Sequence, residues 1–417
     1  MSVKHLFHRA IANILQLATP VMGSIGMYQV WSGLLNKFGF APYKVIDAGS
    51  YIQIHRGTEI KTLVTGRIGY TTHPVYNNDP DDRKLIPQAM SDLACYCYRG
   101  VKLHGDSDFI IDIDSDFVVN DFCRDMDKRF RYYDGATLRV KNNWAILRYD
   151  GRREDRHLSD GIMLSGRFSS NYYHQMYELM IRLLLLDKAE IPESVPLIVD
   201  EIVFRVESLT HIFNNLNSSG RKVITIGSKE VIGFDQLYTF SGVNQIPPHT
   251  RKIRDIVCTN VVFDLDLTLA MRDRLLVIGS TRQFPRRIFL TRKNTSHRHF
   301  NENEVFSLLQ GYGFESVAPE EYSIEDQIAL FHNAEVIVGG TGAAFTNLLF
   351  CSYGCKVICL QHIIADSSIF STIARVVGVE MRYCTQGNKT ANVHGNFVIE
   401  PTCLEATLYK MICCETL

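Results

Sequence analysis

The feature that most constrains the fold is a regular alternation of short apolar strands and helices in the second half of the chain. The expected strands lie at 288–291, 315–318, 336–338 and 356–360, and the expected helices at 301–311, 323–333, 342–350 and 366–377. Asn301 and Glu304 have the spacing of a capping box, and Ser323 is suited to cap the next helix. Such alternation predicts βαβ units in a parallel, doubly wound sheet.

The first half of the chain divides into two regions. Residues 43–150 indicate short strands, at 43–48, 59–64, 109–119 and 144–149, separated by Gly, Asn and Asp turns. Residues 160–245 indicate a mixed pattern, with helices at 171–188 and 201–216 and strands at 197–200 and 222–226. A stretch at 241–256 that contains two prolines suggests an inter-domain hinge.

The expected fold class is therefore α/β, with two Rossmann-like domains that face a cleft and a strand-rich N-terminal part. The expected domains are 1–245 and 246–385, followed by a tail at 386–417 with a helix at 400–412 that returns to the first domain. Ligands of open α/β sheets bind at the carboxyl ends of the strands, which places the cleft there.

Composition excludes several classes of protein. With 417 residues, 46% of them hydrophobic and 21% charged, the chain is a typical globular protein rather than a disordered or integral-membrane one. A net charge of −1 gives no basic excess, so we expect no nucleic-acid partner. Eleven scattered cysteines, an odd number, favour a reducing compartment. Because residues 1–35 show no evident secretory signal, we expect a cytoplasmic protein. Residues 1–35 are mildly apolar, which predicts a helix packed on the body or a peripheral contact with the inner face of the cell membrane.

The strongest local motif is the segment 336–347, Val-Ile-Val-Gly-Gly-Thr-Gly-Ala-Ala-Phe-Thr-Asn. A buried strand enters a glycine turn that opens directly into a helix, whose unpaired N–H groups favour a bound phosphate. The alternative is that the glycines only allow the strand and helix to pack closely. The spacing matches neither the Walker motif nor G-x-G-x-x-G.

A cationic stretch precedes this motif. Residues 275–301 contain no acidic residue but six arginines and lysines. Arg292 and Lys293 follow the expected strand 288–291, where they could contact the same phosphate. Arg286 and Arg287 fall at the far end of that strand and are expected to be solvated.

The helix expected at 171–188 carries a polar stripe beside its apolar face. His174 and Glu178 are four residues apart and face the same way, so they could act as a base and its orienting partner, or form a solvated ion pair.

Three other motifs have simpler explanations. Asp264 and Asp266 resemble the nucleophile motif of haloacid-dehalogenase-type phosphatases, but no matching acidic loop follows. The aspartates at 112, 114 and 116 are expected on an exposed strand face. Cysteines 351, 355 and 359 are not expected to converge on zinc.

Taken in order, these motifs resemble glycosyltransferase family 61 over roughly residues 90–385. The resemblance rests on the following segments: Asn171-Tyr172-Tyr173-His174, Glu178, 287–292, 301–304, Gly313-Phe314-Glu315, Pro319-Glu320, Ser323, Gln327, Phe331, Gly340-Thr341-Gly342-Ala343 and Thr346-Asn347.

The resemblance implies a GT-B arrangement and inverting transfer of a sugar from a nucleotide-diphosphate sugar, which we expect to be UDP-linked. The acceptor would be a hydroxyl of a glycan or glycolipid, in bacterial surface polysaccharide or capsule biosynthesis. No cofactor or metal is implied. The predicted catalytic residues are His174 and Glu178. The predicted donor-binding residues are Arg292, Lys293, Glu320, Gly340, Thr341, Gly342, Ala343, Thr346 and Asn347.

Thr341 stands where the family usually has a histidine, and Thr291 where a serine is usual. The first departure motivates an alternative, a non-catalytic nucleotide- or sugar-binding subunit of the same fold. A phosphatase that uses Asp264 is a third hypothesis.

Overall fold

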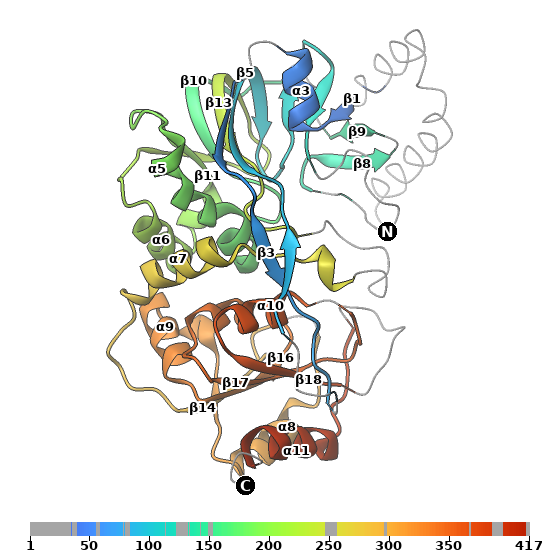
Figure 1. Ribbon diagram of the computed structural model, residues 1–417, viewed down its shortest axis with the longest axis vertical. Helices are drawn as coiled ribbons and strands as arrows, with labels where there is room; N and C mark the ends of the chain where they lie inside the picture. Colours follow the sequence, from blue (N-terminus) through green and yellow to red (C-terminus); the bar gives the residue numbers. More distant parts are fainter. Residues whose placement is uncertain are drawn as a thin grey trace.

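The computed structural model describes residues 35, 40–55, 59–77, 79, 84–112, 114–121, 132, 134–141, 143–148, 153–246, 257–295, 298–366, 368–385 and 395–413. The described residues form two large sheets that follow one another along the long axis of the molecule, with helices between them, and a third sheet of two strands (Figure 1). The predictions for residues 1–34 and for most of the hinge lie outside the described residues.

The first sheet contains eleven strands in the order β12-β11-β10-β13-β5-β6-β7-β1-β9-β8, with β2 paired to β5. Its strands are β1 Ala41–Ile46, β2 Glu59–Val64, β5 Leu93–His104, β6 Ile110–Asp112, β7 Phe117–Val119, β8 Thr137–Lys141, β9 Trp144–Leu147, β10 Arg156–Leu164, β11 Leu197–Asp200, β12 Val223–Ile226 and β13 Val231–Phe240. Strands β12, β11, β10 and β13 are parallel, and the antiparallel pairing of β13 with β5 joins them to the strand-rich part. The sheet is therefore mixed, and the region 43–150 extends it rather than forming a layer of its own.

The second sheet is entirely parallel, in the order β15-β14-β16-β17-β18. Its strands are β14 Arg287–Leu290, β15 Glu315–Val317, β16 Val336–Gly340, β17 Lys356–Leu360 and β18 Glu380–Cys384. Strand β14 comes first in sequence among the strands of this sheet, yet it lies between β15 and β16, so the strand order reverses at β14. Doubly wound sheets bind their ligands at such a switch point.

Helices cover both faces of the second sheet (Figure 1). They are α8 Glu302–Gln310, η6 Pro319–Glu321, α9 Ile324–Asn333, η7 Ala343–Phe350, α10 Ile369–Val376, α11 Pro401–Leu408 and η8 Tyr409–Cys413. Side chains alternate along each strand, so Phe289 packs with α8 and α11 while Ile288 and Leu290 belong to the core on the opposite face, with α9, η7 and α10.

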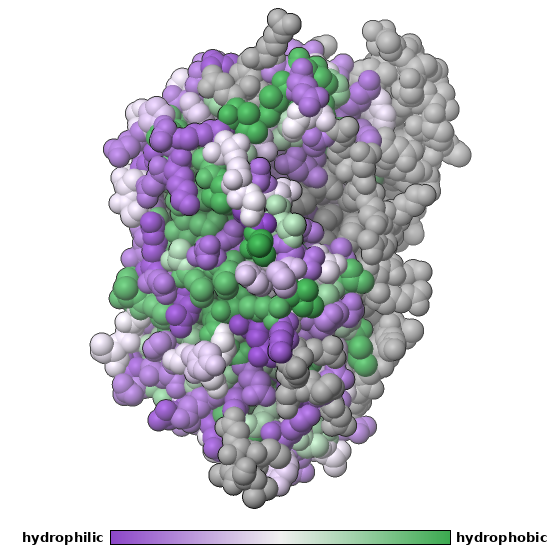
Figure 2. Space-filling view, viewed as in Figure 1, coloured by the Kyte–Doolittle hydropathy of each residue, from purple (hydrophilic) through white to green (hydrophobic). Residues whose placement is uncertain are grey.

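The helices of the first half are α3 Ala48–Ile54, α4 Tyr172–His174, η1 Gln175–Leu179, η2 Met180–Leu185, α5 Leu186–Ala189, η3 Glu201–Phe204, α6 Glu207–Leu216, η5 Cys258–Asn260 and α7 Leu265–Leu276. One hydrophobic core runs from the helical segment 172–189 through α6 and α7 to the near face of the second sheet. Figure 2 shows apolar residues gathered in a band across the viewed surface of the molecule, at the height of α7 in Figure 1. The two halves are thus packed together by a shared core, and no helix among the described residues is long and apolar enough to cross a membrane.

A hairpin links the two sheets. Strands β3 Ile68–Thr71 and β4 Ile86–Ala89 pair with each other, and the loop between them reaches the edge of the second sheet. There Tyr76 forms a parallel bridge with Tyr383, and the Asn77 amide donates to the carbonyl of Thr385. A segment from the first half of the sequence therefore extends the edge of the second sheet.

Several sequence predictions need correction. The apolar face of the tail helix packs beneath the second sheet, where Leu404 and Leu408 of α11 lie with Phe289 and Val305. Its contact with the predicted first domain is made by Lys410 of η8, which donates to the carbonyl of Asp79. Asn301 does not form a capping box, since its side-chain amide donates to the carboxylate of Glu304 and to a remote carbonyl instead. The aspartates at 112, 114 and 116 do not share an exposed strand face. Asp112 is buried at the end of β6, where its carboxylate accepts the N–H groups of residues 114 and 115, and Asp114 and Asp116 lie in the turn before β7.

Candidate functional site

A cleft of about 950 Å³ opens at the carboxyl ends of β14 and β16. Its floor is formed by the residues after these strands, and its opposite wall by the starts of α4 and α6. The cleft therefore lies at the switch point of the second sheet and faces the first sheet's helices. Of the predicted donor-side residues, it is lined by Arg292, Glu320, Gly340, Gly342, Ala343 and Asn347.

Two arginines converge on the floor of this cleft. The guanidinium groups of Arg292 and Arg298 both donate to the carbonyl of Thr341, at 2.9 and 3.3 Å. Burial lowers the pKa of Arg292, and the neighbouring charge of Arg298 acts in the same direction, whereas Glu302 and Glu320 oppose it. Two guanidinium groups beside one carbonyl concentrate positive charge, and their N–H forks suit phosphate oxygens.

The glycine turn makes room for this arrangement. A Cβ on Gly340 would lie 2.8 Å from Cδ of Arg292, and one on Gly342 would lie 2.5 Å from its Nη1. Both contacts are too short for a real side chain. The glycines thus let the Arg292 side chain lie against the backbone of the turn, a role that neither sequence interpretation had anticipated.

The other predicted donor-side residues differ in their placement. Lys293 is exposed and does not line the cleft itself, but it pairs with Glu321, a lining residue, 2.8 Å away. The N–H of Thr341 is already bonded to the carbonyl of Leu360, so it does not point at the cleft. Thr346 is buried, with 1% of its surface exposed, and does not line the cleft.

Asn347 connects the cleft to the first half of the molecule. Its Oδ1 accepts the hydroxyl of Tyr172 at 2.7 Å, and its Nδ2 donates to Gln327 at 2.9 Å. The residue before Tyr172, Asn171, caps α4 by accepting the N–H of Tyr173. The helix that carries the predicted catalytic pair therefore begins in the wall of the cleft.

His174 and Glu178 are in direct contact. Nδ1 of His174 lies 2.6 Å from Oε1 of Glu178. Burial would raise the pKa of Glu178, but the hydrogen bond from His174 and the charges of His174, Arg167 and Arg182 outweigh it and hold that pKa below its usual value. An ionised carboxylate only accepts hydrogen bonds, so Nδ1 carries the proton and Nε2 is left as the basic nitrogen.

The pair is embedded in a charged network. Arg167 bonds Asp108 at 3.1 Å and lies 3.7 Å from the second oxygen of Glu178. The next residue, Phe168, has a φ of +58°, a conformation that bulky side chains rarely adopt. Two carboxylates hold this loop by accepting backbone N–H groups, Asp200 from Gly166 and Asp108 from Arg167. Strained backbone of this kind gathers at functional sites.

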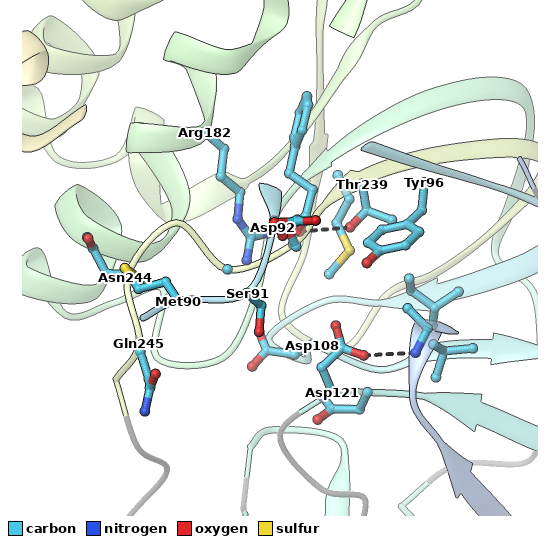
Figure 3. Close-up of a pocket in the computed structure, with 18 of the residues that line it drawn as sticks. Met90, Ser91, Asp92, Tyr96, Asp108, Asp121, Arg182, Thr239, Asn244 and Gln245 are labelled. Atoms are coloured by element: carbon cyan, nitrogen blue, oxygen red, sulfur yellow. Dashed lines mark hydrogen bonds between the residues drawn. The ribbon is translucent and has the colours of Figure 1, made fainter. Parts of the chain in front are cut away.

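A second cavity, of about 460 Å³, lies beside this network in the first half of the molecule. Figure 3 shows Asp108 and Arg182 among its lining residues, with Tyr96 and Thr239 on the neighbouring strands. Neither His174 nor Glu178 lines it, but Arg182 follows Glu178 by one helical turn.

Among the described residues, one group has the composition and spacing to hold a metal ion: His73, Cys258 and Asp366. His73 lies 3.0 Å from Asp366 and 3.4 Å from the Cys258 sulfur. None of the three lines either cavity. Cysteines 351, 355 and 359 form no such group in the described part of the chain.

Sequence reasoning missed three members of the site. Arg298 belonged to the cationic stretch but received no role, because its contact depends on a backbone φ of +59°. Arg167 and Asp108 carried no motif. Asp264, the hypothetical phosphatase nucleophile, is the N-cap of α7 and pairs with Arg67 at 2.8 Å, which is a structural role.

Comparison with known families identifies the class of protein. Residues 172–358 match the family model described as Glycosyltransferase 61, so this segment is a glycosyltransferase 61 domain, as the resemblance predicted. The match begins at the wall of the cleft with Tyr172 and includes the glycine turn. Glycosyl transfer uses a sugar donor and a glycan acceptor. No curated protein matches the chain.

Proposed function

We propose that the chain is an inverting glycosyltransferase of GT-B type that takes a sugar from a nucleotide-diphosphate sugar, with UDP as the expected nucleotide. The observation that carries this proposal is the convergence of Arg292 and Arg298 on the Thr341 carbonyl, at the switch point of the second sheet. The donor diphosphate would lie against these guanidinium groups, with Glu320 and Asn347 nearby in the same cleft.

His174 is the proposed base and Glu178 its positioning residue. The acceptor hydroxyl attacks the anomeric carbon on the face opposite the diphosphate, and its proton passes to Nε2 of His174. The bond from the anomeric carbon to the diphosphate oxygen breaks as the new bond forms, so the configuration inverts. Glu178 holds the imidazole through Nδ1 and stabilises the imidazolium that results.

Charge that develops on the departing diphosphate is stabilised by the two guanidinium groups. Preorganised cationic donors of this kind supply several kcal/mol of transition-state stabilisation without a metal ion. The acceptor would approach from the first sheet's side of the cleft, which agrees with the position of His174 on the helix that forms that wall.

A thermal-shift comparison tests the donor site. Nucleotide diphosphates and nucleotide sugars should raise the melting temperature of the wild type, because a ligand of the folded state stabilises it by mass action. The shift should disappear in Arg292→Ala and Arg298→Ala and persist in Arg286→Ala, whose arginine is exposed and pairs with Glu335. A shift that survives both cleft substitutions would refute the assignment. Binding without turnover across a broad acceptor panel would favour the non-catalytic subunit.

A further inference from the structure

The 460 Å³ cavity of the first half has no role in the reaction as proposed above, yet it borders the same charged network (Figure 3). Asp108 lines it on one side and pairs with Arg167, which in turn lies beside Glu178. Arg182 lines it on the other side. The cavity is therefore connected to the catalytic pair through side chains on the same helix and the same loop.

Arg182 is the informative residue. Its Nε is enclosed by protein and has no hydrogen-bond partner among the described residues, whereas the side chain as a whole is partly exposed and lines the cavity. Burial lowers the pKa of Arg182, while the charges of Asp108 and Glu178 act in the opposite direction. Arg67, a second arginine in the cavity wall, is by contrast fully engaged, with Asp264 and two backbone carbonyls. The outer nitrogens of the Arg182 guanidinium are therefore available to donate to a ligand that enters the cavity.

The other lining groups define the chemistry of that ligand. Asp92, Asp108 and Asp121 contribute carboxylate acceptors, which outnumber the one unengaged guanidinium and disfavour an anion. Tyr96 adds an aromatic face and a hydroxyl, and Gln245 an exposed amide. Hydrogen-bond acceptors and donors arranged around an aromatic ring suit a ligand whose hydroxyl groups both donate and accept hydrogen bonds.

The position of the cavity gives the size of the ligand. Ten residues separate Tyr172, in the wall of the donor cleft, from Arg182, which corresponds to roughly 15 Å along a helix. A single sugar in the donor cleft would not span this separation, but an extended oligosaccharide with one end at His174 would.

We infer that this cavity is a binding site for a neutral, hydroxyl-rich part of the acceptor glycan, several sugar units from the hydroxyl that reacts. The inference rests on the proposed function. The donor and the distal part of the acceptor would then lie at opposite ends of the polar stripe formed by His174, Glu178 and Arg182.

Binding of oligosaccharides to the full chain without any donor tests this assignment. The probe is an array of neutral oligosaccharides of increasing length, with matched members that carry uronic acids. Wild type should retain neutral oligosaccharides over monosaccharides and over the acidic members. Arg182→Gln should weaken retention about tenfold or more, because a charge-assisted hydrogen bond is lost. Arg205→Gln, on an exposed arginine outside the cavity, is the matched control.

Two milder substitutions are not expected to disturb folding, so they test the cavity even if Arg182→Gln misfolds. Tyr96→Phe removes one hydroxyl, and Gln245→Ala changes an exposed side chain, and each should weaken retention severalfold without changing the melting temperature. Wild type that binds no oligosaccharide, prefers acidic ones, or is unaffected by all three substitutions would overturn the inference. The thermal shift with nucleotide diphosphates should be unchanged in each variant. Its absence in wild type would instead count against the proposed donor site.

Discussion

The hydroxyl of Tyr172 donates to Oδ1 of Asn347 at 2.7 Å, and this bond joins the helix of His174 to the helix that follows the glycine turn. Tyr172 belongs to the first half of the molecule and Asn347 to η7, a helix that covers the second sheet. The two predicted halves of the active site are therefore joined in the wall of the cleft by this side-chain pair, as they are by His211 of α6 and Glu325 of α9, whose Nδ1 and Oε1 lie 2.7 Å apart. Burial raises the pKa of Tyr172, so the phenol stays a donor at neutral pH.

Tyr172→Phe removes this bond and leaves Oδ1 of Asn347 without its donor. We expect a loss of about 1 kcal/mol of unfolding free energy and a larger effect on turnover, about tenfold in kcat/KM, because the donor and the base are no longer held together. Urea unfolding and steady-state kinetics would measure the two effects. Tyr353→Phe, at a tyrosine that is 89% exposed, should change neither. Equal turnover in both variants would show that the bond does not align the site.

Gly342→Ala tests the fit between the glycine turn and Arg292. Gly342 has a φ of 173°, which any residue can adopt, so the new methyl group acts only through its 2.5 Å approach to Nη1 of Arg292. The arginine must move, and we expect affinity for nucleotide diphosphates and kcat to fall, the latter by up to about 100-fold. Gly311→Ala offers a control at a helical glycine with one contact at 3.3 Å. Full affinity in Gly342→Ala, measured by calorimetry, would mean that Arg292 does not contact the donor.

The catalytic pair gives a prediction with two distinct outcomes. His174→Ala removes the proposed base, and we expect kcat to fall by about 100- to 10,000-fold. Glu178→Gln keeps the shape but loses the charge that orients the imidazole, so its loss should be smaller and its rate should depend on pH differently from wild type. Pre-steady-state rates over a range of pH would separate the two variants. If Glu178→Gln is as impaired as His174→Ala and both show the wild-type pH profile, the roles are assigned wrongly.

Much of the second sheet could be predicted from the sequence, because its strands are short apolar runs that end in glycine or polar turns. Helix α9 and strand β17 have the predicted bounds, and β14, β15 and β16 differ by one or two residues. The strands β5 and β13 were missed. Polar residues interrupt both, and they are stabilised by pairing with each other across more than a hundred residues of sequence.

The site was predictable only where it follows from local pattern. The contact of His174 with Glu178 follows from helical spacing, although the helix has a π segment at 175–179 that no pattern indicated. Local π segments are frequent at functional sites. Arg298 and the unengaged Arg182 could not be predicted, because their roles depend on loop conformation and on which carboxylates remain available after folding.

Asp200 should make stability depend on pH between about pH 4 and 7. Burial raises the pKa of Asp200 from 3.8 to about 7. The folded state therefore binds a proton that the unfolded state releases between these values. The free energy of unfolding should fall as pH rises from about 4 to 7, by about 4 kcal/mol from this group, and be constant above. Asp200→Asn should match wild type near pH 4 and exceed it at pH 8, as measured by urea unfolding. If wild type has a higher free energy of unfolding than Asp200→Asn at pH 8, the pKa of Asp200 is not raised.

Removal of metal ions should not affect transfer. The positive charge that faces the predicted diphosphate comes from Arg292 and Arg298, which remain charged at any working pH. The group with metal-binding spacing in the described part of the chain, His73 with Cys258 and Asp366, lines neither cavity. Activity measured after chelation and dialysis should therefore equal that with added Mg²⁺ or Mn²⁺. If activity is lost on chelation and restored by Mn²⁺ but not by Zn²⁺, a metal ion bridges the diphosphate and the arginines do not suffice. If Zn²⁺ alone restores it, and Cys258→Ser abolishes the rescue, the group at His73 stabilises the fold on which the cleft depends.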